Sequence, residues 1–145
     1  MISVVKNIIL AIILFCPNVL WSQDSSAIQT EVLSRSTVSW DGKTLPGYGH
    51  GKPEITILKI RIPAGAQLPL HQHPVINAGF LLSGELTVVT EGNKTLHLKA
   101  GESLIEVVNT WHYGKNEGTT PAEIIIFYAG TKDSLITIKK ENLKK

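Results

Sequence analysis

Short apolar segments, separated by glycine, proline and asparagine, recur at intervals of about ten residues over most of the chain. Valine, isoleucine, leucine and threonine predominate in them, and no long helical period competes with this pattern. The pattern is typical of an antiparallel all-β domain. It predicts strands at residues 32–39, 55–62, 68–73, 78–82, 85–90, 95–98, 103–107, 111–115, 123–128 and 135–138.

Residues that favour turns separate the predicted strands. Glu91, Gly92 and Asn93 stand between two strand signals and predict a hairpin tip. The predicted core consists of Ile57, Leu58, Ile60, Ile62, Leu81, Leu86, Val88, Leu96, Leu98, Leu104, Ile124, Ile126 and Phe127.

The start of the chain differs from this pattern. Lys6 is followed by the unbroken apolar run 8–15, and a small residue, Ser22, comes shortly after Pro17. These features predict a secretory signal peptide at residues 1–22, and we favour cleavage over an uncleaved anchor because the run is too short to span a bilayer. The protein is therefore expected to be exported, to the periplasm or the medium. Cys16, the only cysteine, lies within this segment.

Composition divides the remainder into a polar, flexible arm at 23–30, one folded domain at 31–138 and a basic tail at 139–145. Without Lys6, the 14 lysine and arginine residues become 13, against 12 aspartate and glutamate residues. A nearly neutral domain gives no indication of nucleic-acid binding. No membrane contact is expected after signal cleavage.

Three histidines stand out as candidate metal ligands. His71 and His73 are two residues apart in a predicted strand, so both imidazoles point to the same face. A third histidine, His112, lies in a second segment that also begins with a glycine. Three imidazoles are often enough to hold a transition metal, whereas two rarely are.

The two segments resemble the paired motifs of the cupin superfamily. In the first, Gly65, His71, His73 and Gly84 have the spacing GxxxxxHxH with a further glycine; in the second, Gly101, His112 and Asn116 fit GxxxxxPxGxxHxxxN. The resemblance implies a single-domain, cupin-like jelly-roll β-barrel with one divalent metal ion in its interior. It also implies a homodimer, for which we expect residues 32–39 to supply the contact.

The sequence departs from the cupin pattern at three positions. Val107 and Asn109 replace the second motif's proline and glycine, which alters a turn. Asn77 stands where the family has a glutamate, and this alters the chemistry because an amide oxygen is a neutral, weaker ligand. Asn77 either ligates the ion as a fourth ligand or holds a bound water or substrate. In both cases the ion keeps its double charge and favours an anionic ligand.

Other polar residues carry weaker signals. Glu106 is a candidate general acid or base, but a solvated glutamate at a strand end is the favoured interpretation. The glycine-rich loop at 40–51 either overhangs a pocket or, as we favour, caps one end of the barrel. Gly79 either leaves space in the cavity or marks a bulge. Asn116 is expected to brace a strand end.

The favoured function is a metal-binding protein that acts on a small, anionic molecule through a three-histidine site, by oxygenase-like or Lewis-acid chemistry. The alternatives are a module that binds a small ligand without turnover and a metal buffer. A buffer would release its ion readily. Zinc, manganese, nickel, iron and copper are all compatible with imidazole ligands. No catalytic residue beyond the metal site is identified.

Overall fold

The computed structural model describes residues 27–144. The predicted signal peptide at 1–22 and the first part of the predicted arm, up to residue 26, lie outside the described residues. Residues 27–30 are exposed and form neither helix nor strand. A compact unit begins at Glu31.

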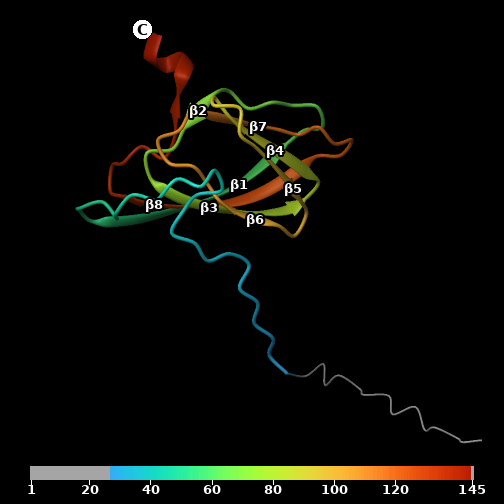
Figure 1. The fold of residues 1–145 in the computed structure, drawn as a ribbon, viewed down its shortest axis with the longest axis horizontal. Coiled ribbons are helices and arrows are strands. Elements are labelled where there is room, and N and C mark those ends of the chain that lie inside the picture. Colours follow the sequence, from blue (N-terminus) through green and yellow to red (C-terminus); the bar gives the residue numbers. More distant parts are fainter. Residues whose placement is uncertain (1–26, 145) are drawn as a thin grey trace, which may run out of the picture. The chain divides into compact units, whose positions relative to one another are not determined.

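This unit consists of β-strands and one short 3-10 helix, η1, at its end (Figure 1). The elements are β1 (Pro53–Ile62), β2 (His71–Gln72), β3 (Ile76–Ser83), β4 (Glu85–Thr90), β5 (Thr95–Lys99), β6 (Ser103–Ile105), β7 (His112–Lys115), β8 (Ala122–Thr131), β9 (Ile138–Lys139) and η1 (Lys140–Lys144).

The strands form two antiparallel sheets, one with the order β1-β8-β3-β6 and the other with the order β5-β4-β7-β2-β9. Apart from the β4–β5 hairpin, successive strands alternate between the two sheets. This alternation is the jelly-roll arrangement, and the predicted all-β fold is confirmed. The ladders remain two sheets and do not join into one continuously hydrogen-bonded barrel.

Strand β8 shows why the sheets pack face to face. Ile124, Ile126 and Tyr128 have the same parity and are buried, whereas Phe127 has the opposite parity and is 48% exposed. Because side chains alternate along a strand, one face of β8 is apolar and points to the core. Burying each such isoleucine stabilises the fold by about 1.5–3 kcal/mol.

Three residues of the predicted core are exposed instead. Ile57 and Phe127 pair directly across β1 and β8, so both point out from the sheet. Leu58 points inward but is 36% exposed, because β1 is the edge of its sheet. Parity along a strand was visible in the sequence, but which parity faces the second sheet was not.

Four predicted strands are shorter than expected or absent. The strand predicted at 103–107 ends at Ile105, as β6. Residues 32–39 form no strand apart from a single bridge between Val38 and Thr44, and Val32 is 70% exposed. The strand predicted at 68–73 is reduced to β2, since Pro69 and Pro74 flank it and lack a backbone N–H for pairing. The strand predicted at 135–138 is reduced to its last residue and the one after it, in β9.

The chain's last described residues are tied to the second sheet. Lys139 lies one residue beyond the predicted domain end at 138, and it pairs with His71 in the β2–β9 ladder. Lys140 then donates its backbone N–H to the Leu70 carbonyl oxygen (3.0 Å). The basic tail therefore starts inside the fold. Among residues 27–144, no helix is long and apolar enough to span a membrane.

Candidate metal centre

The three histidines lie together between the two sheets. His71 is in β2 and His112 is in β7, and they are directly opposite each other in the β2–β7 ladder. His73 follows two residues after His71, on the same face. The ring centroids are 4.4 Å apart for His71 and His112, and 5.0 Å apart for each pair that includes His73. One nitrogen from each ring lies within 4.8 Å of the others.

A backbone carbonyl oxygen fixes the orientation of each ring. The Nδ1 pairs are His71 with Pro69 (2.7 Å), His73 with Ile136 (2.7 Å) and His112 with Thr110 (2.8 Å). A carbonyl oxygen only accepts, so each Nδ1 carries the proton and each Nε2 keeps a lone pair. Metal-ligating histidines commonly use the second ring nitrogen in this way.

Burial keeps these rings neutral. It lowers the pKa of His71 and of His112, and it lowers the pKa of His73 to about 3, further than the hydrogen bond to Ile136 raises it. At neutral pH the site therefore presents uncharged imidazoles, the protonation state in which they bind metal ions.

The prediction that Glu106 is a solvated residue at a strand end is wrong. Glu106 is only 5% exposed, and its Oε2 lies 3.9 Å from Nε2 of His112. Because His112 is neutral, this contact is not an ion pair. Burial raises the pKa of Glu106. The sequence did hold a signal, since Glu106 has the parity of the core residue Leu104 and therefore faces the interior.

Asn77 is buried as well, with 1% of its surface exposed. Its Nδ2 donates to the Val75 carbonyl oxygen (3.2 Å), whereas its Oδ1 has no hydrogen-bond partner among the described residues. Asn77 pairs with Tyr128 across β3 and β8. Direct ligation by Asn77 stays a prediction.

A small cavity of about 40 Å³ lies at the histidines. Its polar lining consists of His71, His73, His112, Glu106 and Tyr128, and the other lining residues are Ile60, Ile62, Leu68, Leu86, Val88, Gly114, Ile124 and Ile126. Asn77 is not among them. This volume is enough for an ion with a few small ligands.

A second, more open groove of about 160 Å³ reaches His71 and His73 from outside. It is lined by Leu58, Ile60, Leu68, Pro69, His71, His73, Tyr128, Thr137 and Lys139. Leu58, Pro69 and Lys139 are exposed, so the groove connects the site to solvent. Burial raises the pKa of Tyr128 to about 12, and its phenol is therefore neutral.

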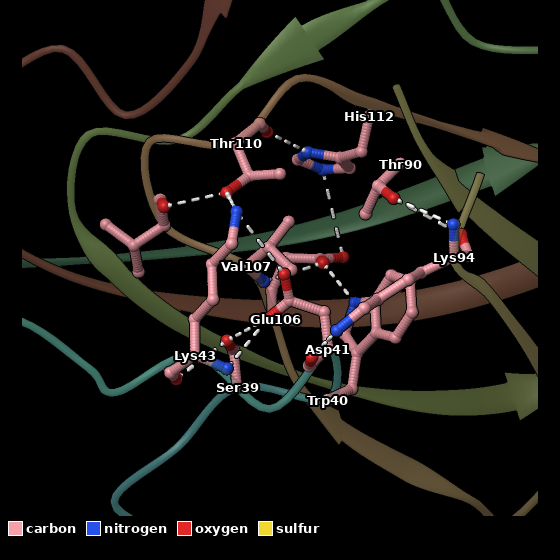
Figure 2. A network of polar contacts seen from close by, with 11 residues as sticks. Ser39, Trp40, Asp41, Lys43, Thr90, Lys94, Glu106, Val107, Thr110 and His112 are labelled. Carbon is pink, nitrogen blue, oxygen red and sulfur yellow. Dashed lines mark hydrogen bonds and ion pairs between the residues drawn. The ribbon is translucent and has the colours of Figure 1, made fainter. Parts of the chain in front are cut away.

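A turn before β1 braces the other side of the site (Figure 2). Trp40 donates its backbone N–H to the Ile105 carbonyl oxygen (2.9 Å) and its Nε1–H to Oε1 of Glu106 (2.7 Å). Lys43 donates through Nζ to Oγ1 of Thr110 (2.9 Å), the residue whose carbonyl oxygen holds His112. The start of the 40–51 loop therefore holds Glu106 and the segment before His112 in place, and the predicted cap on one end of the barrel stays a prediction.

Two further predictions about single residues can be compared with the structure. Asn116 braces the end of β7, because its Nδ2 donates to the carbonyl oxygens of Ile62 (3.0 Å) and Thr120 (2.8 Å). Gly79 leaves no free space: a Cβ there would lie 2.8 Å from Cδ2 of Leu104. Glycine at this position allows Leu104 to pack against the backbone of β3.

The family comparison agrees with this geometry. A family model described as a cupin domain matches residues 58–128, a stretch that contains all three histidines and Glu106. The chain belongs to the cupin superfamily. No curated protein matches the sequence of this cupin.

Several solved structures resemble this cupin in fold. They include the DMSP lyase DddQ from Ruegeria pomeroyi (22% identity, TM-score 0.52, covering 59% of this chain and 43% of that one), the oxalate decarboxylase of Lactobacillus farciminis as a formate complex (20%, 0.54, 61% and 27%), and the Bacillus subtilis oxalate decarboxylase with Mn(II) centres (22%, 0.53, 61% and 24%). The chain spans less than half the length of each. At these identities the likeness shows the fold alone.

Proposed function

We propose that this cupin binds one divalent metal ion through Nε2 of His71, His73 and His112 and holds a small molecule at the open side of the ion. One observation carries the proposal: every Nδ1–H is used on a backbone carbonyl oxygen, so three lone pairs converge on one point. Lone pairs that face one another in a largely apolar pocket repel, and a cation bound by all three nitrogens removes that repulsion.

The groove suggests what reaches the ion. Its walls are largely apolar, and Lys139 supplies a positive charge at the exposed rim. A small molecule with an apolar part and one anionic group matches this lining, because the anion gains from both the ion and the lysine. A bound divalent ion would polarise a carbonyl group or acidify a water molecule.

The proteins of similar fold support the same class of function. One is a lyase of DMSP and two are decarboxylases of oxalate, one of them with Mn(II) centres. DMSP and oxalate are small molecules, and manganese is a divalent ion. For this cupin, manganese, zinc, nickel, iron and copper are the ions to test, and export would favour zinc or copper on affinity.

Export and dimer formation are further parts of the proposal. Export rests on the pattern of residues 1–22. A homodimer would cover the exposed apolar side chains Ile55, Ile57 and Phe127, which share the outer face of β1 and β8. Light scattering or sedimentation of the purified protein measures its oligomeric state directly.

Elemental analysis and a calorimetric metal titration of the purified protein test the proposal. The wild-type protein should bind one divalent ion per chain, and a His71→Ala/His73→Ala variant should lose at least about 1,000-fold in affinity, roughly 4 kcal/mol. His97→Ala is the matched control, because His97 is exposed and lies on β5, an edge strand that carries none of the three histidines. Equal metal binding by the wild type and the double variant would contradict the proposal.

A further inference from the structure

Glu106 lies directly across the ladder from Asn77. The β3–β6 register pairs Ala78 with Ile105, so the next pair along the ladder is Asn77 with Glu106. The backbone N–H of Glu106 donates to the Asn77 carbonyl oxygen (3.1 Å), which continues the ladder by that pair. Side chains directly opposite in an antiparallel pair point to the same face. Asn77 and Glu106 therefore occupy equivalent places on the inner face of the sheet.

The carboxylate of Glu106 is held in one orientation. Its Oε1 accepts hydrogen bonds from Nε1 of Trp40 (2.7 Å) and from the backbone N–H of Val107 (2.8 Å). Its Oε2 is then turned to Nε2 of His112, at 3.9 Å. Two lone-pair atoms that face each other in a buried site repel, and a cation beside both of them reverses the sign of the interaction.

We propose that Glu106 is the carboxylate member of the metal site, contributed from the ladder partner of position 77 instead of from position 77 itself. This inference rests on the proposed function and adds a residue to it. The metal-facing set is then three neutral imidazoles and one carboxylate, and the ion keeps one net positive charge. A site with three histidines and Asn77 alone would keep two.

The same geometry explains the neutral residue at position 77. A glutamate there would stand directly opposite Glu106 on one buried face, and like charges in that arrangement are destabilising. Asn77 fills the position without a second charge. Its Nδ2 donates to the Val75 carbonyl oxygen, and its Oδ1 has no partner among the described residues.

Two measurements on one variant test the inference. Glu106→Gln keeps the size of the side chain and an oxygen that accepts from Trp40 and Val107. We expect its affinity for Zn²⁺ or Mn²⁺ to fall about 10- to 100-fold. The affinity of the metal-loaded variant for azide should rise about fivefold or more, since the ion regains a positive charge. Structural damage alone would lower both affinities.

Matched variants complete the experiment. Glu54→Gln, at an exposed position in β1, should leave both affinities unchanged. Asn77→Glu combined with Glu106→Gln moves the carboxylate across the ladder and should recover most of the lost metal affinity. Unchanged metal affinity in Glu106→Gln, or no recovery in the double variant, would overturn the inference while the wild type still binds metal. A wild-type protein that binds no divalent ion would overturn the proposed function instead.

Discussion

Two rows of side chains on the inner face of the same sheet have opposite chemistry. One, here called the apolar row, consists of Ile60, Ile124 and Leu81, which pair across β1, β8 and β3. The other, here called the polar row, consists of Tyr128, Asn77 and Glu106, which follow each other across β8, β3 and the end of β6. The rows are separated by four residues along β3 and β8.

The difference between the rows separates residues that stabilise the fold from polar residues near the candidate site. Leu81 and Ile124 are 0% and 1% exposed and contribute burial of apolar surface. The polar row is also buried; Tyr128 and Glu106 line the cavity at the histidines, whereas Asn77 does not. Polar groups are costly in an interior unless each has a partner. The apolar row therefore provides stability that the polar row lacks in the absence of an ion.

The largest expected effect on stability comes from truncating a side chain in the apolar row. Leu81→Ala should lower the free energy of unfolding by about 2–5 kcal/mol, because it removes a fully buried side chain and leaves a cavity. Urea titration followed by circular dichroism measures this. Metal stoichiometry at saturation should stay at the wild-type value, and its loss would show that the two rows are not independent.

Acidification should lower the free energy of unfolding of the metal-free protein through the histidines of the site. The pKa of His73 is 6.5 in the unfolded chain and about 3 in the folded one, so between these values only the unfolded state binds the proton. Stability is therefore lost as the pH falls below about 6.5, by about 2 kcal/mol at pH 5 from His73 alone. The pKa values of His71 and His112 are also lowered and add in the same direction.

Comparison with His73→Gln isolates this effect, since the raised pKa of Glu106 acts in the opposite direction in both proteins. With metal removed by a chelator, urea titrations at pH 7 and pH 5 should show a smaller loss in the variant, by about 2 kcal/mol. An equal loss in the two proteins would mean that His73 titrates in the folded state as it does in the unfolded chain.

A smaller effect, an increase in the free energy of unfolding, is expected from a substitution of Asn77. Asn77→Leu removes the buried Oδ1 that has no partner and should raise the free energy of unfolding of the metal-free protein by about 1 kcal/mol. Metal affinity of the same variant, measured by calorimetry, tests ligation by Asn77. A loss of affinity as large as that of Glu106→Gln would give Asn77 a ligand's role.

The smallest effect is expected on the outer face of the same sheet. Ile57 is 57% exposed, and Ile57→Thr should change the free energy of unfolding by less than about 0.5 kcal/mol. Thermal unfolding of a dilute sample measures it. A loss of several kcal/mol would mean that this face is buried in solution, as in the predicted dimer.

The histidine site was largely predictable, because its signals are local. The two-residue spacing of His71 and His73 determines a common face in any strand, and the framing glycines bring in His112 through the family pattern. The two-residue strand β2 and the loss of the strand at 32–39 were not predictable. Pairing depends on a partner strand, and an apolar alternation does not show whether one is within reach.

Sequence alone determined the all-β fold, the histidine set and the neutral residue at position 77. Only the tertiary structure placed Glu106 beside the histidines, because its position depends on the register of β3 with β6. It also decided the tautomer of His73, since the carbonyl oxygen of Ile136, 63 residues further along the chain, is held beside the ring by a loop. Residue types and their spacing can be read from the sequence, whereas the register of two strands and the contact of a loop with a site arise only when distant segments pack.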